Sequence, residues 1–310
     1  MTLLKRRRVL AASIEGTSGT AEVLDGTDAT FNAFDIGLSL DIEMIEREGQ
    51  AFGMVPAMPG GHKAKMTFKI DAAWDGTATE PAWADIFLPA CGWVKSSQTY
   101  TPRTEVPGSN VKTVTIEQYT NGIKTQIYGA AGTFKLVCPT GKSAYFEFEF
   151  TGIWGGRSDA AILSPTYATE LPLRYANSTT TWNSVALCLE NITLDSGNEV
   201  IMRECATNTA GFHAALITGR KVKVTGNPES KLVATTDRWG ALLASTEATL
   251  TWDLDGPTNS KITIAAPKAQ IVAAAEGDRN GLLTDELTWN CNRNGSTVDQ
   301  EASIVFTAAT

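Results

Sequence analysis

The feature that most constrains this fold is a local pattern that occurs twice along the chain. Residues Pro81–Leu88 have the spacing of a short amphipathic helix, and a strand pattern with alternating lysines, Lys63–Lys69, precedes them. Residues Asp237–Ala244 repeat this arrangement after a second basic strand pattern. The helix tryptophans, Trp83 and Trp239, lie 156 positions apart, which is close to half of the 310-residue chain. The sequence therefore predicts two consecutive copies of one unit.

Other landmarks keep nearly the same separation, which supports the duplication. The equivalent pairs are Arg47 and Arg203 (156 apart), Met66 and Val224 (158 apart), and the runs Glu147–Phe150 and Glu286–Trp289 (139 apart). The shorter separation predicts a deletion of about 17 residues in the second copy, and the Pro/Ser/Gly-rich segment Thr99–Asn110 accounts for most of it. Solenoid repeats have periods of roughly 20 to 50 residues, so a period this long indicates two whole domains.

Alternation of apolar and polar residues with a period of two dominates both halves and predicts strands with one buried face. In one such strand Ala64, Met66, Phe68 and Ile70 alternate with Lys63, Lys65, Thr67 and Lys69. The expected fold class is mainly β, with two tandem β-sandwich or half-barrel domains that each carry one short helix. The expected division is residues 1–155 with an N-terminal arm, a linker at 156–180, and residues 181–310.

Composition places the chain among ordinary globular proteins. Hydrophobic residues make up 43% and charged residues 19% of the sequence, outside the range of disordered chains. No apolar run approaches the roughly 20 residues that span a bilayer, so we expect no membrane insertion. The apolar stretch after the basic N-terminus is too short for a signal peptide. Five scattered cysteines without a CxxC pair indicate reduced thiols and synthesis in the cytosol.

Residue patterns for catalysis or metal binding are weak. His62 and His213 are the only histidines, and neither has metal-ligand spacing. Asp253-Leu254-Asp255-Gly256 matches only part of a calcium loop, so a hairpin turn explains it better. We therefore expect no enzyme and no cofactor. The basic run Lys5–Arg8 stands in a chain of net charge −8, which favours an arm that docks on an acidic neighbour over a nucleic-acid grip.

Several longer segments carry a resemblance to a known family. They are Arg8–Ala21, Gly60–Met66, Leu88–Trp93, Val111–Glu117, Asn121–Phe134, Ala144–Trp154, Ile192–Val200 and Ile217–Val222. Together they resemble the major tail tube proteins of long-tailed (siphovirus-type) bacteriophages, in a tandem-duplicated form. The resemblance covers nearly the whole chain, although no single motif is diagnostic. The doubling departs from the simplest family members and puts a plain ring of six chains in doubt.

The resemblance implies a structural protein of the virion that is made and assembled in the host cytoplasm. Its sheets would join neighbours into a continuous inner β-barrel, and its rings would stack into a hollow helical tube for transient, non-sequence-specific passage of phage DNA. Because each chain carries two units, three chains complete six units, so we expect a homotrimeric ring with pseudo-sixfold symmetry; the alternative is a homohexamer. Further implied partners are the tape-measure protein, the tail terminator and tail-tip proteins.

Two sets of residues are candidates for these contacts. The ring-stacking candidates lie in the N-terminal arm (2–20), the loop around 48–61 and its counterpart at 205–219, and are Arg6, Arg7, Arg8, Met44, Phe52, Met54, Met58 and Phe212. The apolar residues of the first loop, Met44, Phe52, Met54 and Met58, could equally pack back onto their own sandwich. A lumen that repels phosphate needs carboxylates, and the candidates on outward strand positions are Glu117, Glu147, Glu149 and Asp253.

Other classes share the alternation pattern. A secreted two-domain β-sandwich adhesin or carbohydrate-binding module is the main alternative, and it predicts a signal peptide and clustered exposed aromatic side chains. A tube from a sheathed phage or a secretion system is closer in kind, but the resemblance and the doubling favour a flexible, non-contractile tail.

Overall fold

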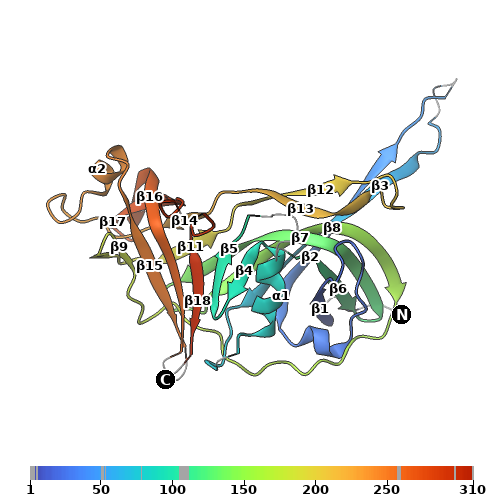
Figure 1. The fold of residues 1–310 in the computed structure, drawn as a ribbon, viewed down its shortest axis with the longest axis horizontal. Coiled ribbons are helices and arrows are strands. Elements are labelled where there is room, and N and C mark those ends of the chain that lie inside the picture. The colour runs from blue at the N-terminus through green and yellow to red at the C-terminus, as the bar shows by residue number, and fades with distance from the viewer. Residues whose placement is uncertain are drawn as a thin grey trace.

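A computed structural model describes residues 4, 6–49, 52, 54–77, 79–104, 112–256, 260–296 and 298–308. These residues form one 16-stranded antiparallel sheet and a separate two-stranded hairpin, with two short α-helices (Figure 1). The fold class is therefore mainly β, as the period-two alternation predicted.

The strands fall into two sets along the chain. The first half contributes β1 (Arg8–Ile14), β2 (Ala33–Ile45), β3 (Met58–Asp71), β4 (Trp93–Ser96), β5 (Thr99–Pro102), β6 (Val114–Thr120), β7 (Ile123–Pro139) and β8 (Tyr145–Asp159). The second half contributes β9 (Thr181–Trp182), β10 (Val185–Ala186), β11 (Asn191–Asp195), β12 (Asn198–Glu204), β13 (Phe212–Arg220), β14 (Lys223–Gly226), β15 (Glu247–Asp255), β16 (Lys261–Arg279), β17 (Leu282–Cys291) and β18 (Ser303–Thr307).

The large sheet crosses from one half of the chain to the other. Its order is β10-β9-β15-β16-β17-β14-β11-β7-β8-β3-β2, and β6 carries β1 as a branch from β7. β8 runs along one edge of β7, so β6 and β11 share the other edge, at residues 123–130 and 135–139 respectively. A second link runs through β18, which pairs with both β16 and β5. β12 and β13 form the separate hairpin.

Both helices that the sequence predicts are present. α1 (Ala82–Ala90) begins after Pro81 and buries Trp83, Phe87 and Leu88 against the core face of the sheet. The Phe87 ring lies 5.0 Å from that of Phe68 in β3. α2 (Arg238–Leu243) is shorter, and its N-terminal cap is the Asp237 carboxylate, which accepts from the amide of Gly240 at 2.7 Å. A 3₁₀ turn, η1 (Gly26–Ala29), precedes β2.

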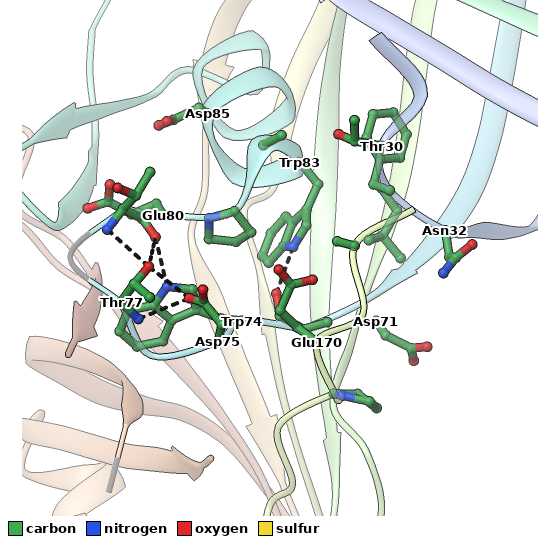
Figure 2. Close-up of a pocket in the computed structure, with 18 residues that line it drawn as sticks. Thr30, Asn32, Asp71, Trp74, Asp75, Thr77, Glu80, Trp83, Asp85 and Glu170 are labelled. Atoms are coloured by element: carbon green, nitrogen blue, oxygen red, sulfur yellow. Dashed lines mark hydrogen bonds between the residues drawn. The ribbon is translucent and has the colours of Figure 1, made fainter. Parts of the chain in front are cut away.

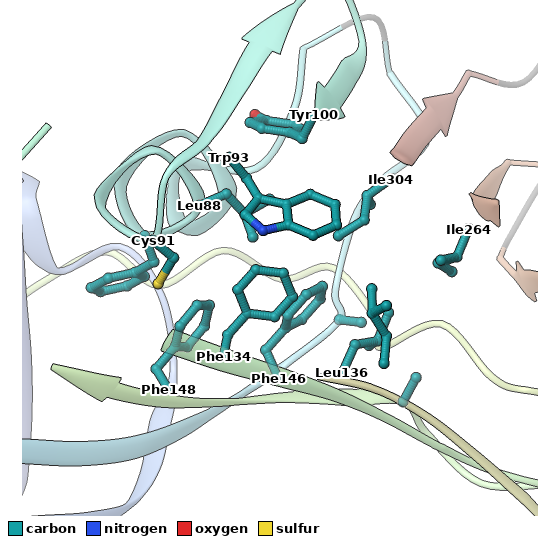
Figure 3. Close-up of a cluster of buried hydrophobic side chains, with 14 of the residues drawn as sticks. Leu88, Cys91, Trp93, Tyr100, Phe134, Leu136, Phe146, Phe148, Ile264 and Ile304 are labelled. Carbon is teal, nitrogen blue, oxygen red and sulfur yellow. The ribbon is translucent and has the colours of Figure 1, made fainter. Parts of the chain in front are cut away.

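One contiguous core draws on both halves. In Figure 3 the indole of Trp93 lies over Phe134 and Phe146 of the first half, while Ile264 and Ile304 of the second half close the same cluster. The rings of Trp93 and Phe134 are 5.2 Å apart. Dense packing of this kind makes each large side chain sensitive to truncation. The proposed division into 1–155, 156–180 and 181–310 stays a prediction; β8 itself continues to Asp159.

Phe306 is the clearest bridge between the halves. It stands on β18 near the end of the chain and is fully buried. Its ring packs against Trp74 at 5.3 Å, Tyr100 at 5.7 Å and Trp83 at 6.3 Å, all from the first half. A side chain of the second half therefore completes the aromatic core of the first.

Replacement of Phe306 by alanine is expected to lower the free energy of unfolding by about 3–5 kcal/mol, because it leaves a cavity among three aromatic rings. Tryptophan fluorescence during denaturant unfolding measures this loss. Leu243→Ala is the matched control, since Leu243 is 87% exposed and its loss is expected to change stability by less than about 0.5 kcal/mol. Equal stability of Phe306→Ala and the parent chain would show that the halves do not share a core.

Candidate functional site

The long β2–β3 hairpin projects from the body of the molecule as an arm, defined here by the described residues between 42 and 60 (Figure 1). The arm carries four of the predicted stacking residues. Their exposed fractions are 52% for Met44, 113% for Phe52, 86% for Met54 and 56% for Met58. Residues 50, 51 and 53 of the same loop lie outside the described residues. The alternative in which these side chains pack onto their own sandwich is therefore wrong.

β2 is also an open edge of the large sheet. It is the last strand in the order and pairs only with β3 among the described strands. Leu38 stands opposite Met66 and Leu40 opposite Ala64, and both partners are buried on the core face. Leu38 and Leu40 themselves are 38% and 43% exposed, so the core face continues to the edge without cover. A long apolar edge strand is a template for pairing with another chain.

The hairpin β12–β13 gives the second half a comparable projection, but this one lies on the first half. Its tip accepts a hydrogen bond at the carbonyl of Ala210 from the amide of His62, 3.2 Å away. Phe212 packs over Gly61, where an added Cβ would lie 3.0 Å from the ring, and Lys63 Nζ stands 5.9 Å from the ring centroid. Phe212, predicted as a stacking contact, therefore contacts its own chain.

The N-terminal segment is built into the sheet instead of forming a free arm. β1 pairs with β6 along its length, and Leu10, Ala11 and Ala12 are buried. The expectation of an arm over residues 2–20 is wrong from Arg8 onward, because an apolar strand follows the basic run. Arg6 and Arg7 are exposed. The guanidinium of Arg8 is half-buried, and its Nη1 donates to the carbonyl of Ile36, in β2, at 2.7 Å.

The buried carboxylate of Glu15 fixes the turn after β1. It accepts hydrogen bonds from the hydroxyls of Thr113 (2.6 Å) and Thr115 (2.9 Å) and from the amides of Gly19 (2.8 Å) and Gly129 (2.5 Å). Four donors compensate for the burial of one charge. The turn therefore has a structural explanation.

The face of the sheet opposite the core carries a ladder of opposite charges across five strands. The ion pairs run from β2 to β11 and are Asp41–Lys63 (3.3 Å), Asp35–Lys69 (3.3 Å), Lys69–Glu147 (3.2 Å), Lys65–Glu149 (2.7 Å) and Lys135–Asp195 (3.2 Å). Hydrogen bonds from Lys69 to Glu147 and Asp35 raise the pKa of its ammonium group. Two of the lumen candidates, Glu147 and Glu149, thus lie on this polar face, each beside a lysine.

The other two lumen candidates lie elsewhere. Glu117 is 1% exposed and accepts hydrogen bonds from Tyr119 (2.6 Å), Lys124 (2.8 Å) and Gln126 (2.8 Å). Burial and this carboxylate raise the pKa of Tyr119. The expectation that Glu117 points outward is wrong, because a second apolar cluster that includes Leu24, Ala29 and Tyr119 packs on that face. Asp253 stands on β15, half-buried, and accepts from the Thr263 hydroxyl at 2.7 Å.

A hollow of about 500 Å³ lies between the end of β3, the start of α1 and residues 168–172 (Figure 2). Its walls carry the carboxylates of Asp71, Asp75, Glu80, Asp85 and Glu170. Lys95 binds two of them, Glu80 at 2.6 Å and Asp85 at 2.9 Å. Trp74 and Trp83 are buried, so they offer no open ring for stacking. Within the described residues, no group of three potential metal ligands comes together here or elsewhere.

No protein-family model matches the chain, and no curated protein matches its sequence significantly. Neither α-helix of the described chain is long and apolar enough to cross a bilayer.

The open edge of β2, the arm and the polar face were only partly visible in the sequence. Alternation predicted the strands, but the order of the strands in the sheet decides which edge is open.

Burial and hydrogen bonding change the pKa of several cysteine thiols. Burial raises the pKa of the Cys91 thiol well above its usual range, and that of Cys138 and Cys291 to about 12. Cys188 is exposed, and a hydrogen bond with Thr207 lowers the pKa of Cys205 near the tip of the β12–β13 hairpin.

Iodoacetamide at neutral pH is therefore expected to alkylate Cys188 and Cys205 in the native protein and to spare the three buried thiols. Peptide mass mapping gives the sites, and the same reaction in denaturant should label all five cysteines as a control. Labelling of Cys138 in the native protein would contradict the buried β7–β11 joint.

Proposed function

We propose that this protein is the tail tube protein of a long-tailed, siphovirus-type bacteriophage, which polymerises into stacked rings around a channel for the genome. The observation that carries the proposal is the long open edge of β2. It lies in a chain whose two halves already extend one another's sheet through β7 and β11. A chain that pairs its own halves in this way needs only one further joint of the same kind to close a ring.

The strand order supports the tandem duplication. The first half runs β2-β3-β8-β7-β6-β1, and the second runs β11-β14-β17-β16-β15-β9. In the chain α1 follows β3 and α2 follows β14, and these two strands hold the second place in the two orders. Positions that the sequence equates also have equivalent partners: Met66 stands opposite Phe150, and Val224 stands opposite Trp289. The β4–β5 hairpin has no counterpart between α2 and β15, which agrees with the shorter second copy.

Ring closure follows from the number of units. Each chain supplies two four-stranded units to the continuous sheet, β2-β3-β8-β7 and β11-β14-β17-β16. Three chains therefore supply six units, and a closed barrel of roughly 24 strands has no open edges. This favours a homotrimeric ring with pseudo-sixfold symmetry over a homohexamer. The exposed apolar arm then provides a heterologous contact along the tube axis, since such contacts generate open filaments.

The polar face is the candidate lining of the lumen. Its lysines stand beside carboxylates, among them Glu147 and Glu149, so few positive charges are free to hold phosphate. A lining of paired charges lets DNA slide without tight binding. Glu117 has no part in this lining because it is buried. The tape-measure, terminator and tail-tip proteins remain the proposed partners, and the virion the proposed location.

The adhesin or carbohydrate-binding alternative finds less support. Sugar sites use exposed aromatic rings that lie together. The exposed aromatic side chains of the described residues belong to four separate elements and are Phe34, Phe52, Tyr167 and Trp239. Residues of the 500 Å³ hollow include two tryptophans, but both are buried.

Negative-stain microscopy of the concentrated protein tests the proposal. We expect rings and hollow filaments whose inner barrel is about 50 Å across, as the spacing and tilt of roughly 24 strands require. Leu40→Lys is expected to abolish them without unfolding the chain, because it puts a charge on the exposed edge. The control is Val23→Lys, since Val23 is 96% exposed and lies outside the edge. A parent protein that stays monomeric at every concentration and ionic strength would contradict the function.

A further inference from the structure

We propose that the two open edges of the sheet pair with each other between copies: residues 35–39 of β2 in one copy join antiparallel to residues 275–279 of β16 in the next. The template is the joint between β11 and β7 inside each chain. The inference rests on the proposed self-assembly, and it adds which surfaces meet and in which register.

β16 lacks a strand partner along the part of its edge that corresponds to the part of β7 paired with β11. Along one edge of β7, β6 ends its pairing at Ala130 and β11 takes residues 135–139. Along the matching edge of β16, β15 ends its pairing at Gln270. β17 occupies the opposite edge as far as Arg279, so no described strand pairs with residues 273–279 on the β15 side.

β2 has the sequence of the missing strand, with a bulge between Phe34 and Gly37 that β11 lacks. β2 pairs with β3 as β11 pairs with β14, with Leu38 opposite Met66 and Leu194 opposite Val224. Residues 35–39 read Asp-Ile-Gly-Leu-Ser, and residues 191–195 read Asn-Ile-Thr-Leu-Asp, with isoleucine and leucine at equivalent places. Leu194 is fully buried beside β7, whereas Leu38 is 38% exposed. Pairing with β16 would give Leu38 the neighbour strand that Leu194 has.

The faces of the strands fix the register. In β7, Leu136 stands opposite Leu194, and both are buried on the core face. A bulge after Ile271 shifts β16 by one residue, and Ala274 stands opposite the buried Leu287. Positions 276 and 278 therefore share the core face with Ala274. A slip of one residue would reverse every side chain, so the faces leave only registers that differ by two residues. The equivalence of β8 and β17 selects one of them, because Leu136 stands opposite Phe146 and Glu276 stands opposite Asp285, each four residues before the equivalent Phe150 and Trp289. Leu38 is therefore set opposite Glu276, Ile36 opposite Asp278 and Ser39 opposite Ala275.

The charges at the two edges are complementary. Glu276 and Asp278 are exposed, and neither forms an ion pair within the described chain. Arg8 lies beside β2 through its bond to the Ile36 carbonyl, and its Nε is buried without a hydrogen-bond partner among the described residues. Arg6 and Arg8 line one open hollow together with residues 33–36 of β2. The joint would bring these two guanidinium groups to the two carboxylates, a charge-assisted pairing.

Both edges belong to this chain, and they differ from each other. The partner is therefore a second copy, and the two copies are arranged head to tail. Such heterologous contacts close into a ring when the rotation fits, and three copies complete the six units. A symmetric pair of β2 strands would instead give a closed dimer and leave β16 open.

Disulfide cross-linking tests the register. In a chain with Cys188→Ser and Cys205→Ser, Ser39→Cys is combined with Ala275→Cys, since directly opposed side chains lie within about 5.5 Å at Cβ. Mild oxidation of the assembled protein is expected to give covalent dimers and trimers, with the 39–275 link identified by peptide mass mapping. The control combines Ser39→Cys with Ala274→Cys, whose side chain points to the opposite face, and is expected to stay monomeric on a denaturing gel.

The outcomes separate the joint from the function. Tubes that form without a 39–275 link would overturn the joint and leave the tube function standing. A link between two Ser39→Cys residues would overturn it in favour of a symmetric dimer. A protein that neither assembles nor cross-links would overturn both proposals.

Charge reversal gives an independent readout. Glu276→Lys with Asp278→Lys is expected to prevent assembly, because it sets like charges against Arg6 and Arg8. Glu204→Lys, a reversal on the exposed end of β12, is the matched control. Circular dichroism checks that each variant is folded. Assembly of the double variant at the parent's concentration would contradict the joint.

Discussion

Backbone pairing between β7 and β11 is the interaction on which the rest of the structure depends. It merges the strands of both halves into one sheet and places the two units side by side. The outer edge of β2, and residues 273–279 of β16 on the β15 side, have no neighbour among the described strands. Unpaired backbone groups along such edges are satisfied by water in the single chain, and in the proposed assembly another strand would satisfy them.

The two faces of this sheet have different chemistry, and in the proposed assembly that difference would distinguish the inside from the outside. One face is covered by α1, β18 and the aromatic core, in which side chains of both halves interlock. The other carries exposed lysines and carboxylates in alternating strands. A curved sheet of this kind can bury its apolar face toward the outer layer and present paired charges to a central channel.

Sequence patterning predicted the strands and helices well where one face is buried and the other is exposed to solvent. Met66 and Phe150 are opposite one another on the core face, and α1 falls where the amphipathic spacing put it. Patterning failed at Glu117, because alternation shows that one face is buried without showing that the other is open. The second small cluster, which includes Val9, Leu24 and Tyr119, covers that other face. The contact of Phe212 with Gly61 was missed for a similar reason: it is tertiary and has no local signal.

The open edges could not be read from local pattern at all, since an edge is defined by the order of strands that are distant in sequence. A density map of the assembled particle, at a resolution that separates strands, would show which strand lies beside the open edge of β2. We expect β16 of a neighbouring chain beside residues 35–39 of β2, repeated around a threefold axis. A map in which β2 faces solvent, or pairs with a second β2, would contradict it.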